Sequence, residues 1–283
     1  SLASLVLLSS SDGHVLRADE SRTAPSRAPG IAVRLDVDRA RALDDVTVLR
    51  SASYESFVWA EVASADIARL EASGVRFERF EDGTSIAIGG HVFDPLAGEP
   101  IVPAEWAAAD GGTGPALRLV QLVGPTKDEW LGHMRALGLA IVQYQAQHAY
   151  LVWATQDQID ELARQPFVRW TGPYHPAYRV APELRAQTGV LDASVLLYDP
   201  AFGDVASDLR RVGAILATVD EAVGPTRYAE VRVQAGRLAA LARLRGVMAV
   251  NAGMRVPGEL DEMSDKINAD MITGSGPEAI PPR

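Results

Sequence analysis

The residues of this chain that most often do chemistry are its histidines, and their spacing predicts neither an active site nor a metal site. The five are His14, His91, His133, His148 and His175. No two of them stand at the spacing of metal ligands, and the His-Glu-x-x-His helix of zinc peptidases is absent. The chain also has no cysteine, which excludes disulfides, zinc–thiolate sites and thiol catalysis. We therefore expect structural roles for the histidines and no bound metal.

The other motifs of enzyme chemistry are missing as well. No Gly-x-Ser-x-Gly elbow occurs, and no serine stands beside a local histidine and aspartate in a recognised context. The acid pairs Asp44-Asp45 and Asp261-Glu262 are adjacent, so their side chains point in different directions. The glycines at 111–114 lack the lysine of a phosphate-binding loop. We predict no catalytic residue, no cofactor and no enzymatic activity for this chain.

Aromatic side chains offer a second kind of site, because tyrosine and tryptophan are favoured both at interfaces and in cores. They gather in the middle of the chain, as Trp130, Tyr144, Tyr150, Trp153, Trp170, Tyr174 and Tyr178. For Trp153 and Trp170 we favour a core position. For Tyr174 and Tyr178, which stand in a proline-punctuated stretch, contact with a neighbouring domain and burial in the core are equally good interpretations.

The elements that position these residues follow a pattern that occurs three times. Each copy is an apolar strand, a short helix and a second apolar strand, over residues 57–77, 150–170 and 230–250. The second and third copies are preceded by another strand–helix–strand, over 117–144 and 195–219. Two such halves interleave into a four-stranded antiparallel sheet with two helices on one face. We therefore predict an α+β protein of repeated ferredoxin-like (βαββαβ) units.

The domain boundaries follow from composition. Glycine and proline are frequent at 94–116, which predicts a linker. The first ferredoxin-like unit is incomplete, because residues 31–56 lack a good helix, and it ends in a hairpin around Gly89-Gly90. The predicted segments are an N-terminal strand and linker at 1–30, the first unit with its hairpin at 31–95, a linker at 96–116, the second unit at 117–182, the third unit at 190–257 and an extended tail at 258–283.

Charge and hydropathy exclude several partners. The net charge of −10 argues against nucleic acid and against an anionic membrane surface. No stretch approaches the roughly 20 apolar residues of a membrane-spanning helix. The apolar segment Ser1 to Ser10 is interpreted as an N-terminal strand at residues 5–8, with the end of a secretory signal as the alternative.

One region of the sequence is similar to a known family. The run VRWTGPYHPAY at 168–178 is the most specific part, supported by LVQLVGP at 119–125, the pair Glu129-Trp130 and the hairpin IAIGGHVFDP at 86–95. These segments resemble the long N-terminal prosegment of bacterial subtilisin-like serine proteases. Residues 260–271 resemble the stretch that leads into the protease domain in such precursors. The Asp-His-Ser motifs of the protease itself are absent from this chain.

The resemblance implies the function of an intramolecular chaperone and inhibitor in a secreted or periplasmic bacterial zymogen. Its partner is the cognate subtilisin-like protease domain, which has two surface helices against which the sheet packs. The tail lies in the substrate cleft. The residues that the resemblance assigns to protease contact are Tyr174, Tyr178, Ile280, Pro281, Pro282 and Arg283. Pro281 departs from the family, because it has no N–H to donate to the cleft.

Two other functions compete with the prosegment. A stand-alone interaction or adhesion module built of repeats explains the three copies, although unequal copies with long linkers make a poor solenoid. A ferredoxin-like enzyme requires an acid–base pair in a cleft, and the sequence shows none.

Overall fold

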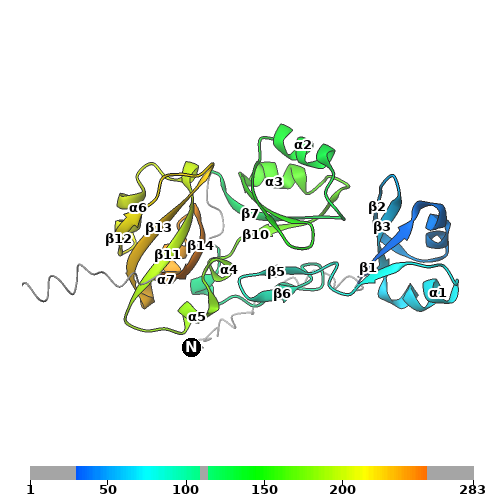
Figure 1. The fold of residues 1–283 in the computed structure, drawn as a ribbon, viewed down its shortest axis with the longest axis horizontal. Coiled ribbons are helices and arrows are strands. Elements are labelled where there is room, and N and C mark those ends of the chain that lie inside the picture. The colour runs from blue at the N-terminus through cyan, green and yellow to red at the C-terminus, as the bar shows by residue number, and fades with distance from the viewer. Residues whose placement is uncertain (1–29, 109–113, 254–283) are drawn as a thin grey trace, which may run out of the picture.

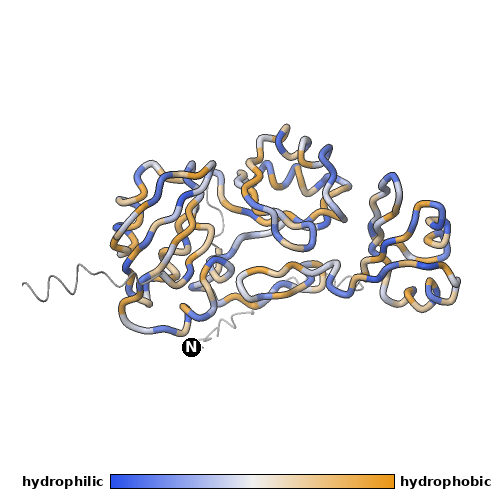
Figure 2. Tube along the Cα trace, in the orientation of Figure 1, coloured by the Kyte–Doolittle hydropathy of each residue, from blue (hydrophilic) through white to orange (hydrophobic). Residues whose placement is uncertain are grey.

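A computed structural model describes residues 30–108 and 114–253, and it contains three four-stranded sheets and one two-stranded hairpin. All pairings within the sheets are antiparallel, and helices accompany each four-stranded sheet (Figure 1). The predicted α+β class with antiparallel sheets is thus confirmed. Hydrophobic stretches follow the strands of all three sheets and of the hairpin (Figure 2).

The first sheet has the strand order β2-β3-β1-β4. Its elements are β1 (Gly30–Asp36), η1 (Val37–Asp45), β2 (Val48–Ser53), β3 (Phe57–Ala63), η2 (Ser64–Asp66), α1 (Ile67–Ala72) and β4 (Glu78–Phe80). The stretch that lacked a good helix forms the 3-10 helix η1. The strand predicted at 75–77 was wrong by three residues, because pairing with β1 begins only at Glu78, opposite Arg34.

The second sheet has the strand order β10-β7-β9-β8. Its elements are β7 (Ala116–Leu122), α2 (Asp128–Ala136), β8 (Ala140–Gln145), β9 (Ala149–Ala154), α3 (Gln156–Leu162) and β10 (Val168–Pro173). Helix α3 starts at a capping box in which Thr155 accepts from the Gln158 N–H and the Gln158 side chain accepts from the Thr155 N–H. One sheet face packs on these helices through Val120, Leu122 and Val152.

The third sheet has the strand order β12-β13-β11-β14. Its elements are β11 (Val190–Tyr198), η4 (Asp199–Ala201), α6 (Val205–Arg211), β12 (Ala214–Val219), β13 (Thr226–Gln234), η5 (Ala235–Arg237), α7 (Leu238–Ala242) and β14 (Val247–Ala252). Strand β11 begins five residues before the predicted Val195, because its pairing with β13 starts at Val190 opposite Gln234. Its alternate residues Leu191, Ala193, Val195 and Leu197 face the helices in the core.

The hairpin of β5 (Ile86–Ile88) and β6 (His91–Phe93) is separate from the first sheet. Its turn residues Gly89 and Gly90 have φ of 56° and 80°, which suits glycine at both central positions of a tight hairpin turn. The predicted unit 31–95 includes this hairpin, whereas in the structure its buried residues share a hydrophobic cluster with β7 and β9 of the second sheet. The burial of Ile86 and Phe93 against those strands explains the difference.

Short elements join the sheets. They are η3 (Ala104–Trp106), α4 (Pro176–Arg179) and α5 (Pro182–Arg185). In the part of the chain that the structure describes, no helix is long and apolar enough to cross a membrane. The strand predicted at 5–8 and the tail predicted at 258–283 lie outside the described residues.

Candidate functional site

The strongest polar cluster of the described residues joins the first sheet, the hairpin region and the second sheet around Arg169. This guanidinium donates to both carboxylate oxygens of Glu61, at 3.0 and 2.9 Å, and to both of Asp94, at 2.9 and 3.0 Å. It also donates to the Gln121 side chain and the Thr84 carbonyl. Its side chain is 3% exposed. The cluster is therefore a buried, fully hydrogen-bonded ion network.

Electrostatics keep this network charged. Burial alone lowers the pKa of the Arg169 guanidinium, but the hydrogen bonds and charges of Glu61 and Asp94 outweigh it, and the pKa is raised. Arg50 adds a second cation at 3.1 Å from Glu61. The arrangement holds three parts of the chain together: the first sheet, the hairpin region and the second sheet.

A second junction joins the second and third sheets and contains both predicted tyrosines. Tyr174 is 5% exposed and donates its hydroxyl to the Met248 carbonyl at 2.6 Å. Burial raises the pKa of Tyr174 to about 12, so the hydroxyl is a neutral donor. Tyr178 is 3% exposed, and its ring packs edge-on against His91 and His175. Both tyrosines are thus buried, and both contact a neighbouring part of the chain, the third sheet for Tyr174 and the hairpin for Tyr178.

These positions bear on the predicted protease contacts. Tyr174 and Tyr178 have almost no surface to offer a partner, so we do not carry them into the proposed interface. Ile280, Pro281, Pro282 and Arg283 lie outside the described residues. Trp153 and Trp170 pack in the hydrophobic cluster under the hairpin, which agrees with a core position.

The sheet faces without helices are the natural docking surfaces, and two of them are covered by the chain itself. On the first sheet, Trp59 is 5% exposed and its ring lies edge-on to His148 of the second unit, with centroids 5.0 Å apart. On the second sheet, Leu117, Leu119 and Leu151 are covered by the hairpin. Neither of these surfaces is free for a partner in this structure.

The third sheet keeps the part of this face on β12, β13 and the start of β11 exposed, whereas Leu196 and Tyr198 of β11 pack in the cluster shared with the hairpin. Its large apolar side chains Val190, Ile215 and Tyr228 are 55%, 67% and 50% exposed. All three point to the face away from the core, and strand register spaces them along it: Val190 lies opposite Gln234, Ile215 opposite Arg232, and Tyr228 opposite Leu196. We call these three residues with Asp192, Glu230 and Arg232 the open face.

Charge on the open face is mixed. Arg232 Nε lies 3.2 Å from a carboxylate oxygen of Asp192, across neighbouring strands. Both side chains are well exposed, so their ion pair contributes little to stability. The open face thus combines exposed apolar side chains with polar ones, as protein interfaces do. The sequence alternation marks these positions as outward-facing, but it does not reveal which sheet stays uncovered.

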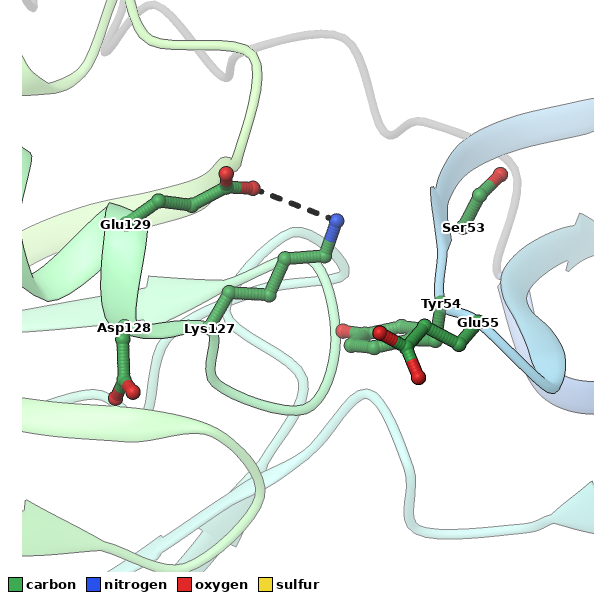
Figure 3. A pocket seen from close by; sticks show the side chains of 6 residues that line it. All are labelled: Ser53, Tyr54, Glu55, Lys127, Asp128 and Glu129. Carbon is green, nitrogen blue, oxygen red and sulfur yellow. Dashed lines mark ion pairs between the residues drawn. The ribbon is translucent and has the colours of Figure 1, made fainter.

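A hollow between the first and second sheets is lined by both signs of charge (Figure 3). Lys127 extends from the start of α2 towards Tyr54, and its ammonium lies 3.5 Å from Glu129 and 5.0 Å from the Tyr54 ring centre. Tyr54 donates its hydroxyl to the Pro125 carbonyl, and burial raises its pKa. Tyr54, Lys127 and Glu129 are thus engaged by neighbours, and the hollow lies at a packing contact between the two units.

The carboxylates and histidines of the described residues form no metal site. Within residues 30–108 and 114–253, no group of three His, Asp or Glu side chains could hold a metal ion. Burial lowers the pKa of His148 to about 4, and burial followed by the charge of Arg185 lowers that of His91. Both imidazoles have a buried Nε2 with no hydrogen-bond partner among the described residues. They are neutral packing groups at neutral pH.

Comparison with known proteins gives one match. A family described as a domain of unknown function, DUF8729, matches residues 87–175, which is less than a third of the chain. The matched range contains β6 of the hairpin and the whole second sheet that the hairpin covers. No curated protein and no solved structure matches the chain.

Proposed function

We propose that this chain is the prosegment of a subtilisin-like serine protease, acting as its inhibitor and folding assistant in a secreted or periplasmic zymogen. The sequence resemblance at 86–178 is the starting point. The proposal includes repeated ferredoxin-like units, and the strand order of each four-stranded sheet supports it: first, third and second strands are neighbours in that order, and the fourth strand lies beside the first.

The observation that carries the proposal is the open face of the third sheet. Two sheets have this surface occupied by other parts of the chain, and the third exposes Val190, Ile215 and Tyr228 at spaced positions on the same face. A flat face of this kind, with exposed apolar side chains beside charged ones, suits packing against surface helices of a partner. Asp192 and Glu230 are carboxylates of the kind that the N-termini of such helices favour.

The proposed docking surface also stands at a suitable place in the chain. Strand β14 pairs with β11 at the edge of this sheet and is the last described element. Residues 254–283 follow it directly in the sequence. In the proposal, this following segment occupies the protease cleft by strand addition while the open face binds the helices. The alternative, a stand-alone interaction module, uses the same face without a protease partner.

The test is a titration of a subtilisin-type protease with the purified chain, following hydrolysis of a chromogenic peptide. We expect tight inhibition, and we expect Ile215→Asp to weaken it at least about tenfold, since a charge replaces an apolar contact worth about 1.4 kcal/mol or more. The matched control is Val92→Asp, which alters an equally apolar side chain that is 68% exposed on the hairpin. The control should inhibit within about twofold of the wild type.

Truncation after Asp270 separates the two parts of the proposed contact. Inhibition that is lost on truncation places the segment after Asp270 in the cleft. Inhibition that survives truncation but fails in Ile215→Asp assigns the affinity to the open face. If the protease encoded with this chain is not inhibited at all, the prosegment proposal is wrong, and the interaction module takes its place.

A further inference from the structure

A small cavity between the second and third sheets is lined by four arginines. Arg118 comes from β7, Arg179 from the end of α4, and Arg243 and Arg245 from the connection between α7 and β14. The cavity measures about 130 Å³. At about 30 Å³ per water, this is the room of roughly four waters, enough for one small anion and too little for a nucleotide.

These arginines have no carboxylate partner among residues 30–108 and 114–253. The ion pairs of these residues include none of the four. The Nε of Arg118 is buried without a hydrogen-bond partner among these described residues. Since buried donors are nearly always satisfied, this atom indicates a missing acceptor in the cavity.

The two inner guanidinium groups repel each other. Arg179 is buried and donates only to backbone carbonyls, those of Tyr174, Ala242, Leu244 and Val247. Burial lowers the pKa of Arg179 to about 10, the Tyr174 hydroxyl partly opposes this, and the charge of Arg118 lowers it further. This concentration of positive charge lies in a chain of net charge −10, so it does not reflect a generally basic protein.

The outer two arginines close the cavity from the third unit. The Nη2 of Arg243 donates to the Ala104 carbonyl at 3.0 Å, and its other guanidinium nitrogens make no hydrogen bond to residues 30–108 or 114–253. A Cβ added at Gly114 would lie 3.1 Å from Arg245 Nη1, so Arg245 lies against the backbone of the cavity wall. Guanidinium groups offer several donors in a fixed plane and match the oxygens of phosphate or sulfate.

We propose that this cavity binds a small oxyanion of the phosphate or sulfate type between the second and third sheets. The bound anion accepts from Arg118 and from the arginines of the third unit, and it relieves the repulsion between Arg118 and Arg179. The proposal is independent of protease binding, because the cavity and the open face lie on different parts of the third unit. Its consequence is that the anion holds the two sheets together.

A carboxylate of the chain itself is the alternative to a free anion as the acceptor in this cavity. Asp110 is the acidic residue of the segment 109–113, which lies outside the described residues and connects Ala108 to Gly114, both at the cavity. An experiment must therefore distinguish a free anion from this side chain. The variant Asp110→Asn removes the carboxylate at nearly the same size.

The test is isothermal titration calorimetry of the full chain with inorganic phosphate, at constant ionic strength balanced by sodium chloride. We expect binding to the wild type, at least tenfold weaker binding to the double variant Arg243→Gln/Arg245→Gln, and unchanged binding to Asp110→Asn. The matched control is Arg210→Gln/Arg211→Gln, which removes the same charge from exposed positions on α6. It should bind phosphate within twofold of the wild type.

Three outcomes overturn the proposal. Absence of binding to both the wild type and Asp110→Asn removes the site. Equal weakening by the two double variants shows a general charge effect instead of a cavity. Binding by Asp110→Asn without binding by the wild type assigns the cavity to the chain's own carboxylate and overturns the free anion.

Discussion

Arg169 is the residue at which the first sheet, the hairpin region and the second sheet meet. It reaches Glu61 of β3, Asp94 after the hairpin and Gln121 of β7, from its own strand β10. A buried ion network of this kind contributes little net stability compared with a well-packed apolar core. Removing only its cation or only its carboxylates, however, is strongly destabilising. The charges that remain are then buried without a partner.

We predict that Arg169→Met lowers the free energy of unfolding by about 3–5 kcal/mol, because Glu61 and Asp94 stay buried without their common cation. Urea unfolding followed by circular dichroism measures the change. Arg164→Met is the control, since the Arg164 side chain is 67% exposed, and it should change the free energy by less than about 0.5 kcal/mol. A loss below 1 kcal/mol for Arg169→Met would show that water reaches the two carboxylates.

Among the elements, the hairpin departs most from its predicted place. The Gly89-Gly90 pair predicts the turn from sequence, and the alternation of Ile86 and Ile88 predicts an apolar face. Neither feature states which surface that face covers, because the partners Leu117 and Leu151 are distant in sequence. The predicted position of β4 was wrong for a similar reason. Val75 and Phe77 are apolar enough for a strand, but pairing with β1 begins at Glu78.

We predict that Gly89→Ala destabilises the protein by about 2 kcal/mol or more. Gly89 has φ of 56°, and an added Cβ would lie 2.5 Å from the backbone of Tyr178. The left-handed backbone costs about 1–2 kcal/mol for alanine, and the backbone contact adds to it. Gly74→Ala is the control, because it has φ of 72° with nothing within 4 Å of the added atom. Thermal unfolding of both variants separates the steric cost at Gly89 from the backbone cost that the two positions share. Equal decreases in melting temperature would contradict a clash with the Tyr178 backbone.

At the scale of the whole molecule, buried contacts join the three sheets. The Arg169 network and the Trp59–His148 contact join the first and second sheets, and the Tyr174–Met248 hydrogen bond joins the second and third. Sequence patterns predict the units but not these contacts, since each contact pairs residues from different units. The open face can be identified only when the covered faces of the first and second sheets are known.

We predict that acid weakens the contact between the first and second sheets through His148. Its pKa is about 4 in the folded chain and about 6.5 when exposed, so the unfolded chain binds the proton first. Stability is therefore complete above pH 6.5 and falls as the pH drops from 6.5 towards 4. The loss from His148 is about 2 kcal/mol after allowance for its partial exposure.

Urea unfolding at pH 7 and at pH 4.5 measures this loss. In the variant His148→Asn the side chain no longer titrates, and asparagine tolerates the φ of 60° at this position. Its pH dependence should be smaller than that of the wild type, and the remainder includes His91, whose lowered pKa has the same sign. Identical slopes for the two proteins would contradict the role of His148.

The packing of the hairpin has a consequence for the time course of synthesis. Ile86, Ile88 and Phe93 leave the ribosome before the strands that cover them, and Met248 of the same cluster follows Ile86 by about 160 residues. At about 5–20 residues per second, the completed cluster appears roughly 10–30 s after its first residue. The nascent hairpin exposes its apolar side only until β7 and β9 emerge, and the contact of this cluster with the third sheet is the last to form.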